Sequence, residues 1–195
     1  MEARKEYKFV LNSYELQNFL QIIDKSQEPL FNQRSIDSLY MDTVGYKLYK
    51  DSNSNDVDKF KVRYRQYDKK GSIFLETKYN KSTGRYKKSV EIKKYVNLDE
   101  VNNFFYHNLS LMPALKVSYT RNYIKYKNTR ITIDKNLKFT SSKQRTRTSY
   151  CYKSNLIVVE YKLLNDDTNI EKNFFKNPVS FSKYNYGLGK VYSIN

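Results

Sequence analysis

The sequence predicts one mostly antiparallel β domain with a few helices, and three observations support this prediction. Stretches that alternate between charged and apolar residues recur along the chain, as the side chains of a strand alternate between the two faces of a sheet. Turn-rich segments such as DKKGS (68–72) and NKSTG (80–84) separate neighbouring stretches. The 195 residues suffice for one sizeable core, and no repeat, linker or break in composition divides them. We therefore expect a single domain over residues 1–195.

The individual elements follow from periodicity and from capping and turn residues. Strands are expected at 3–11, 35–43, 59–67, 72–79, 86–93, 115–127, 129–135 and 155–164. Ser13 suits the N-cap of a helix over about 14–24, which has apolar residues on one side. A second helix is expected over 98–109, a short helix or turn over 45–52, and a short helix within 177–189. The polar segment 140–154 is expected to be a loop.

The stretch KFKVRYRQY, residues 59–67, carries a cation at every second position: Lys59, Lys61, Arg63 and Arg65. Same-face neighbours on a strand lie about 7 Å apart, so each adjacent pair repels by roughly 0.6 kcal/mol in water and about four times that at a protein-like dielectric. The positions between them hold apolar or aromatic residues. A strand with one wholly cationic face indicates that something anionic is bound there.

The composition of the whole chain agrees with an anionic partner. Thirty-six Lys and Arg against 20 Asp and Glu give a net charge of +16, which suits nucleic acid, a membrane surface or a small polyanion. The 20 Tyr and 11 Phe argue against a disordered chain. Cys151 is the single cysteine of the sequence, which excludes an internal disulfide and suits a reducing compartment. No stretch resembles a signal peptide or a membrane span, so we expect a cytoplasmic protein without a membrane segment.

The alternation between charge and apolarity recurs in 3–11, 72–79, 86–93, 129–135 and 155–164. A sheet with one face in the core and one solvated face explains any single strand of this kind. Six or seven such strands also fit an inverted barrel, in which charged faces line a central tunnel and apolar faces are covered from outside. Such a tunnel tolerates its internal repulsion only when a polyanion, or carboxylates and a metal, neutralise it.

Eight short motifs, in order along nearly the whole chain, resemble the polyphosphate-polymerase (VTC) branch of the triphosphate tunnel metalloenzymes, which are related to the CYTH phosphatases. The motifs are RKEYKF (4–9), SLYMDT (38–43), KVRYRQY (61–67), FLETK (74–78), LMPALKVSYTR (111–121), RITID (130–134), VVEYK (158–162) and SKY (182–184). Each motif alone is weak, whereas eight in order at suitable spacing are a specific signal.

The resemblance implies an α+β, mainly antiparallel fold: an eight-stranded triphosphate tunnel barrel with a charged interior and a few covering helices. Polymerases of this branch transfer the γ-phosphoryl group of ATP onto a growing polyphosphate chain, with Mn²⁺ or Mg²⁺ as the divalent metal. The implied partners are therefore ATP or another triphosphate and polyphosphate, and no specific nucleic acid.

The resemblance also implies which residues form the site. The catalytic residues would be Arg63, Arg65, Lys78, Arg121, Arg130 and Lys183. Further phosphate-binding residues would be Arg4, Lys8, Lys61, Lys87, Lys162 and Ser182. The metal would be bound by Glu160, with Glu6 as a weaker candidate. Lys87 or Lys88 could supply the lysine after Gly84, and Lys87 is chosen because it shares a face with Arg85 and Glu91.

The chemistry is consistent with this residue content. Phosphoryl transfer needs oxygens held in line, stabilised charge and a metal, and a terminal phosphate that is ionised near neutral pH attacks without a general base. The only histidine of the sequence, His107, is expected in a helix beside Phe104 and Phe105 and is interpreted as structural. Arginine forks and lysine point charges suit phosphate, and carboxylate oxygens suit magnesium and manganese.

Three alternatives stay open at this point. An inorganic triphosphatase or polyphosphate hydrolase on the same fold would use water in place of the phosphate acceptor. A tunnel without activity would bind polyphosphate only. A nucleic-acid-binding module would suit the net charge, but single-strand binders place aromatic residues on the cationic face. Here Phe60, Val62 and Tyr64 lie on the face opposite the cations.

Overall fold

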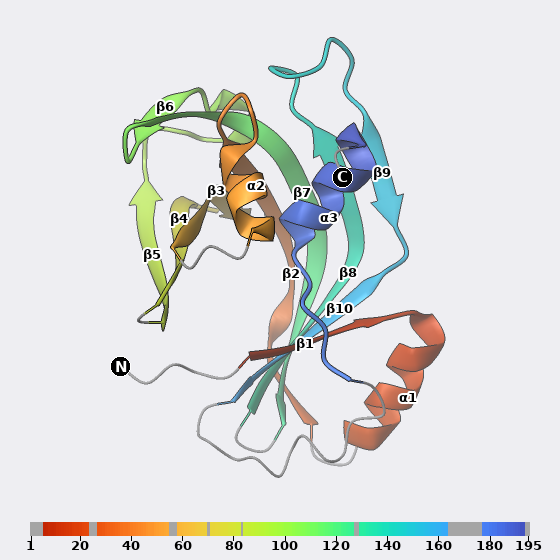
Figure 1. The fold of residues 1–195 in the computed structure, drawn as a ribbon. Helices are drawn as coiled ribbons and strands as arrows, with labels where there is room; N and C mark the ends of the chain where they lie inside the picture. The colour runs from red at the N-terminus through yellow and green to blue at the C-terminus, as the bar shows by residue number, and fades with distance from the viewer. Residues whose placement is uncertain are drawn as a thin grey trace. The chain divides into compact units, whose positions relative to one another are not determined.

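The computed structural model describes residues 6–23, 27–54, 58–69, 71–82, 84–126, 129–163 and 177–193, and Figure 1 labels their elements. The strands are β1 (Glu6–Leu11), β2 (Gln27–Asp42), β3 (Lys59–Tyr67), β4 (Ile73–Lys81), β5 (Gly84–Ile92), β6 (Phe104–Tyr106), β7 (Leu109–Tyr126), β8 (Thr129–Ser141), β9 (Cys151–Ser154) and β10 (Ile157–Leu163). The helices are α1 (Ser13–Ile23), α2 (Lys47–Asn53) and α3 (Lys183–Tyr192), with a 3₁₀ turn, η2, at Leu98–Glu100.

The chain divides into two compact units. Unit 1 comprises Met1–Arg34, Tyr119–Leu137 and Ser154–Ser182, and unit 2 comprises Ser35–Ser118, Lys138–Lys153 and Lys183–Asn195. Strands β2, β7 and β8 contribute residues to both. The strand order over the described residues is β1-β10-β8-β7-β2-β3-β4-β5, with β6 paired to β7 and β9 to β8. The pairs β1–β10, β10–β8, β2–β3, β3–β4, β4–β5 and β6–β7 are antiparallel, as expected from the sequence.

Unit 1 buries the apolar face of its sheet beneath helix α1. Leu16, Phe19 and Ile23 recur at helical spacing and pack on alternate residues of β1 and β10, among them Phe9 and Tyr161. The rings of Phe9 and Phe19 both meet the Tyr161 ring edge to face, with centroids 5.8 Å apart. Because alternate strand residues point to opposite faces, the charged residues between them lie on the other face of this sheet.

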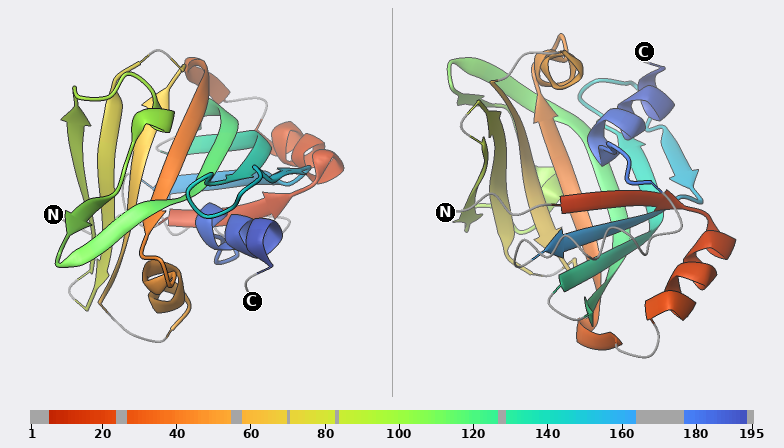
Figure 2. Two further views of the ribbon diagram at one scale, coloured as in Figure 1. Left: turned by 90° about the horizontal axis from the view of Figure 1, so that it is seen from above. Right: turned by 60° about the horizontal axis from the view of Figure 1, so that its bottom comes forward.

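Unit 2 has its own core on the apolar faces of β2 and β3. Its fully buried members include Met41, Val62 and Leu111. Strands β3, β4 and β5 lie side by side, as the two views of Figure 2 show, and pair in continuous antiparallel register. The predicted strand 59–67 coincides with β3, and most other predicted strands agree with the structure within a few residues. The exceptions are the ends of β2, β7 and β8, which continue well beyond the predicted strands.

The helix predicted over 98–109 is wrong. This segment forms the turn η2 and strand β6, which pairs with the start of β7. His107 and Asn108 join those strands as a two-residue loop with φ of 47° and 60°, the left-handed backbone that tight hairpins of this length require. Residues that would also fit a helix face, such as Leu98 and Val101, are buried in the core of unit 2 instead.

The N-terminal cap of α1 is Asn12 and not Ser13. Asn12 Oδ1 accepts a hydrogen bond from Glu15 N at 2.9 Å, and Glu15 Oε2 accepts one from Asn12 N at 2.8 Å. This reciprocal pair is a capping box, in which the fourth residue supplies the second bond. The helix itself, predicted over about 14–24, is confirmed.

The segment 140–154 was expected to be a loop, and both of its ends are strands. Its centre is also fixed, because Arg145 donates hydrogen bonds to the carbonyl oxygens of Pro113, Val44, Asp42 and Thr43 at 2.8–3.2 Å. The Arg145 guanidinium also stacks over a tyrosine ring of the same unit, 4.3 Å from its centroid. Main-chain acceptors several strands away cannot be predicted from the segment itself.

Asp42 joins α2 and α3 within unit 2. It is fully buried, and its two carboxylate oxygens accept hydrogen bonds from Leu48 N at 2.8 Å, Tyr49 N at 2.9 Å and the Tyr184 hydroxyl at 2.6 Å. The two amides belong to the first turn of α2, where a negative charge is favoured by the helix dipole. One side chain therefore caps one helix and fixes the other. Among the described helices, none is long and apolar enough to cross a membrane.

We predict that Asp42→Asn destabilises the protein by roughly 3 kcal/mol, because it removes a buried negative charge and replaces one of the two acceptor oxygens by an amide nitrogen that cannot accept. Urea unfolding followed by circular dichroism measures the change. Asp51→Asn is the matched control, since Asp51 makes an exposed ion pair with Lys47 on α2 and such pairs contribute at most about 1 kcal/mol. Equal effects of both variants would contradict the role given to Asp42.

Candidate functional site

Charged residues of unit 2 form rows across neighbouring strands. Antiparallel register partners point to the same face of a sheet. One row therefore runs from Tyr40 on β2 through Arg63 on β3 to Glu76 on β4. The next row contains Lys61, Lys78 and Lys87 on β3, β4 and β5. Arg65 continues the same face of β3, so both arginines and these three lysines share one face of the sheet with Glu76.

Glu76 lies among these cations. We call Glu76 and the residues around it, Tyr40, Arg63, Arg65 and Lys87, the Glu76 cluster. Arg63 donates to Glu76 Oε2 from both Nε and Nη2, at 2.8 and 2.7 Å. Lys87 Nζ donates to Glu76 Oε1 at 2.5 Å, and Arg65 Nη1 lies 3.6 Å from Oε2. Only 2% of the Glu76 side chain is exposed. Burial by itself raises the pKa of Glu76, but Arg63, Arg65 and Lys87 lower it more, to about 2.

The two arginines of KVRYRQY are held in defined orientations. Arg63 is fixed by Glu76 and donates from Nη1 to the Tyr40 hydroxyl at 3.0 Å. Arg65, with only 6% of its surface exposed, donates from Nε to the Ser38 hydroxyl at 3.2 Å. A guanidinium fixed by a second residue loses less side-chain entropy when it binds phosphate, because its fork is preorganised.

The row of three lysines has like charges in directly opposed positions, which destabilises a sheet unless an anion is present. Lys61 donates to Asn185 Oδ1 of α3 at 2.9 Å, and Lys78 is exposed. The structure places Lys87 on this face, since it contacts Glu76, whereas Lys88 is paired with Thr77 in the neighbouring row of the other face. Lys183, the first residue of α3, is close enough to Tyr40 to lower the pKa of the phenol.

Unit 1 contains a second charged cluster, the Glu160 cluster (Glu6, Lys8, Glu160 and Lys162). Register pairs Lys8 with Glu160 and Glu6 with Lys162 on β1 and β10. Lys162 Nζ lies 3.8 Å from an oxygen of each glutamate, and Lys8 Nζ lies 3.6 Å from Glu6. Burial lowers the pKa of Lys162, while Glu160 and Glu6 partly offset this effect. The carboxylates of Glu6 and Glu160 therefore both lie close to the Lys162 ammonium group.

The other predicted residues of unit 1 lie near this cluster or on its face. Arg130 is exposed and is the register partner of Lys162 on β8. Lys8 also donates to the carbonyl oxygen of Phe181 at 3.2 Å, which brings the segment of Ser182 to β1. Arg121 is buried and forms a two-pronged pair with Asp134, from Nε at 2.5 Å and from Nη2 at 2.7 Å. Arg4 lies outside the described residues.

The Glu160 cluster fits a hard divalent cation. Glu6 and Glu160 supply carboxylate oxygens, and the Thr132 hydroxyl, register partner of Glu160, is buried without a hydrogen-bond partner among the described residues. The described residues contain no group of three or more His, Cys, Asp or Glu side chains suited to a metal. A magnesium-type ion would therefore be held by one or two carboxylates together with water and substrate phosphate oxygens, as this ion commonly is.

Several contacts of the two clusters do not follow from the sequence alone. Glu76 lies in the motif FLETK, but the sequence does not indicate that it pairs with both arginines, nor that Asp134 pairs with Arg121. Tyr40 and Ser38, which contact the arginines, lie in the motif SLYMDT (38–43). The pairing of Glu76 with Arg63 follows from the register of the hairpin β3–β4. The turn DKKGS (68–72), which joins these strands, is the sequence signal from which that register could be predicted.

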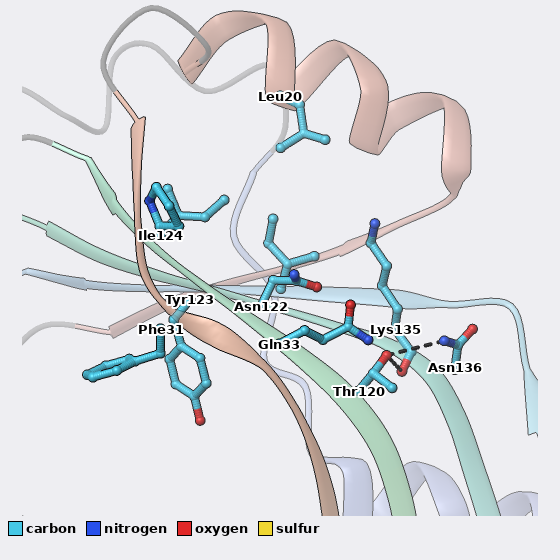
Figure 3. Close-up of a pocket in the computed structure, with 11 residues that line it drawn as sticks. Leu20, Phe31, Gln33, Thr120, Asn122, Tyr123, Ile124, Lys135 and Asn136 are labelled. Atoms are coloured by element: carbon cyan, nitrogen blue, oxygen red, sulfur yellow. Dashed lines mark hydrogen bonds between the residues drawn. The ribbon is translucent and has the colours of Figure 1, made fainter. Parts of the chain in front are cut away.

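A pocket of about 310 Å³ in unit 1 is lined by residues from α1, β2, β7 and β8, including Leu20, Phe31, Asn122 and Lys135 (Figure 3). It lies on the same face of β7 as Ile124, which belongs to the apolar core, and therefore opposite the face of Arg121. Among the described residues of its lining, Lys135 is the one cation. This pocket is therefore a poor match for a triphosphate.

The sequence model of the VTC domain matches residues 3–98 and 93–192, nearly the whole chain. The chain belongs to the VTC domain family. No curated protein matches the sequence significantly. The family expected from the motifs is thus confirmed over both units of this VTC domain.

Solved structures give the fold. A Hippeastrum adenylyl cyclase candidate, described as having a dominant triphosphatase activity, is similar with a TM-score of 0.57 and 12% identity, and 96% of each chain is covered. A Pyrococcus horikoshii protein reaches 0.56 at 15% identity, covering 95% of this chain and 99% of its own. An adenylate cyclase candidate from Vibrio parahaemolyticus reaches 0.51 at 13%, with 88% and 83% covered. These neighbours confirm the expected fold class, a mainly antiparallel β fold with a few helices.

We predict that the Glu76 cluster makes stability depend on acid pH. The pKa of the Glu76 carboxyl is 4.5 when unperturbed and about 2 in the folded protein. The ionised carboxylate therefore contributes up to about 3 kcal/mol to the free energy of unfolding. This contribution is fully present above pH 4.5 and is lost as the pH falls towards 2. Urea unfolding between pH 7 and pH 2 measures it.

The variant Glu76→Gln should be less stable at pH 7 and should lose less stability on acidification than the wild type. Glu91→Gln is the control, because Glu91 is an exposed glutamate on the adjacent strand β5 and should retain the acid dependence. A Glu76→Gln protein with the same loss between pH 5 and pH 2 as the wild type would contradict the assignment.

Proposed function

We propose that this VTC domain is a polyphosphate polymerase, which transfers the γ-phosphoryl group of ATP onto the end of a polyphosphate chain in a metal-dependent reaction. The observation that carries the proposal is the Glu76 cluster, in which a buried carboxylate fixes two arginines beside a row of three lysines. Fixed cations of this kind suit a polyanion, because they are oriented before the substrate arrives.

The residues of unit 2 would stabilise the transferring group. Arg63 and Arg65 would form charge-assisted bonds to nonbridging oxygens, and Lys61, Lys78 and Lys183 would neutralise neighbouring phosphates. A terminal oxygen of polyphosphate forms the new bond to the γ-phosphorus while the bond to the β-phosphate oxygen breaks and ADP leaves. This oxygen is already ionised near neutral pH, so the step requires no general base.

The carboxylates of unit 1 would hold the divalent metal. Glu160 is the principal ligand, with 8% of its surface exposed, and Glu6 supplies a second carboxylate. When bound, Mg²⁺ or Mn²⁺ neutralises charge on the phosphate oxygens during transfer. Lys162 reaches both carboxylates and would keep them charge-balanced before the metal binds.

A second candidate is a triphosphatase, in which water takes the place of the phosphate acceptor. The Hippeastrum structure favours it, since a protein of similar fold is described as having a dominant triphosphatase activity. The same cations would serve both reactions, because hydrolysis and chain extension differ in the acceptor and not in the transferring group. The acceptor therefore decides between the two functions.

We predict that incubation with ATP and Mn²⁺ gives polyphosphate chains of increasing length, seen as a ladder on a gel. Orthophosphate alone would identify the hydrolase instead. Binding of tripolyphosphate without turnover would identify a domain that only binds polyphosphate. Arg65→Ala should reduce product formation at least about tenfold, because it removes a charge-assisted contact of roughly 1.5–3 kcal/mol.

We also predict that Glu160→Gln abolishes metal-dependent turnover and leaves the fold intact, because it removes a ligand charge at nearly constant shape. Turnover is measured with increasing Mn²⁺, and the fold by circular dichroism. Glu15→Gln is the control, since Glu15 caps α1 on an exposed surface. Activity of Glu160→Gln close to that of the wild type at all metal concentrations would place the metal elsewhere.

A further inference from the structure

Tyr40 belongs to the Glu76 cluster but has no role in the mechanism above. It lies on β2 in register with Arg63, on the same face as the arginines, and only 7% of its surface is exposed. A tyrosine on the charged face of a strand, opposite the buried core residues Leu39 and Met41, is not needed to fill that core. Its hydroxyl is the polar group of β2 that contacts Arg63.

The hydrogen bond to Arg63 uses the Tyr40 hydroxyl as an acceptor only. Arg63 Nη1 donates at 3.0 Å, and a guanidinium has no lone pair with which to accept. The phenol therefore keeps its own proton for another partner. Among the described residues no acceptor for this proton is found.

The ring of Tyr40 is fixed in place, so the direction of the hydroxyl is fixed as well. It stacks on the Tyr184 ring with centroids 4.8 Å apart and planes inclined by 16°. Tyr184 is itself held by its hydrogen bond to Asp42 at 2.6 Å and by an edge contact to Tyr49. The support thus extends from Asp42 through Tyr184 to Tyr40, and a hydroxyl held this way is preorganised for a ligand.

The surroundings of the hydroxyl are cationic. Arg63 and Arg65 lie on the adjacent strand, and Lys183 begins the helix that carries Tyr184. An unused proton beside three cations suits an oxygen that carries negative charge, because such hydrogen bonds are stronger than those between neutral groups. A neutral acceptor would form a weaker hydrogen bond here, and a cationic ligand would be repelled.

We propose that Tyr40 is a further substrate-binding residue, whose hydroxyl donates a hydrogen bond to a phosphate oxygen of the triphosphate or polyphosphate held by Arg63 and Arg65. This inference rests on the proposed function, because it assumes that the cations of the Glu76 cluster bind phosphate. Tyr40 would then have two roles: its hydroxyl orients Arg63 as an acceptor, and it contacts the substrate directly as a donor.

Calorimetric titration with tripolyphosphate at pH 7 tests the inference. Tyr40→Phe removes the hydroxyl and keeps the ring that stacks on Tyr184, and it should weaken binding at least about tenfold. Tyr64→Phe is the matched control, since Tyr64 lies on the opposite, apolar face of β3, and it should bind like the wild type. Near-ultraviolet circular dichroism checks that both variants fold.

The outcomes separate the inference from the proposed function. Tripolyphosphate that binds equally to the wild type and to Tyr40→Phe overturns the inference and leaves the proposed function standing. A wild-type protein that does not bind tripolyphosphate overturns both. Tyr40→Phe that weakens binding at least tenfold while Tyr64→Phe does not supports the direct contact.

The pH dependence distinguishes a hydrogen-bond donor from a purely structural tyrosine. Burial raises the pKa of Tyr40, but Arg63, Arg65 and Lys183 lower it more, so that the phenol loses its proton at a lower pH than usual. The charged or titratable groups that face it, directly or through one neighbour, are Arg63 and Arg65 of β3, Glu76 of β4, Lys183 and Tyr184 of α3, Tyr49 of α2 and Asp42.

A donor must be protonated to act, so the affinity advantage of the wild type over Tyr40→Phe should shrink as the pH rises through the pKa of Tyr40. A ratio of affinities that stays constant between pH 7 and pH 10 would overturn the proposal. If Tyr40→Phe fails to fold, the wild type alone still tests the proposal: its affinity should begin to fall at a lower pH than expected for an ordinary tyrosine, and an affinity that does not fall there would overturn it.

Discussion

The buried carboxylate of Glu76 neutralises the cations that surround it, and the charged face of unit 2 depends on this interaction. Without it, Arg63, Arg65 and Lys87 would repel one another in a place where water screens them poorly. With it, each cation is held at a fixed position by a hydrogen bond or ion pair. The same carboxylate therefore makes the face stable without a ligand and leaves a net positive charge for one.

In unit 1 as well, carboxylates neutralise neighbouring cations. In unit 1, Asp134 compensates Arg121, and the two glutamates of the Glu160 cluster share Lys162. Burying a charge is costly unless a partner is present, so each buried cation of these two faces comes with a carboxylate. The proposed binding of phosphate rests on the excess of cations over carboxylates in the Glu76 cluster.

The apolar faces position these charges. Helix α1 covers one face of the unit 1 sheet, and the core around Val62 and Met41 lies behind the rows of unit 2. Because the period of a strand is two, burying the apolar residues forces the charged ones to the other face. Asp42 extends this control to α3, since it fixes Tyr184 and thereby the helix that begins at Lys183.

The sequence by itself determined the strand character, the two-faced pattern of each strand and the family, because alternation and short motifs are local properties of the chain. It predicted β3 over 59–67 and the choice of Lys87 over Lys88 from parity alone. The single domain over 1–195, the cytoplasmic location and the roles of the site residues stay predictions.

Only the tertiary structure decided which carboxylate meets which cation. The pairing of Glu76 with Arg63 and that of Asp134 with Arg121 depend on the register between strands. Residues 98–109 have helical spacing in the sequence, but they form the turn η2 and the strand β6, which leads into a tight loop with left-handed backbone at His107. Register and burial are set by contacts between segments far apart in the chain, and no local pattern encodes them.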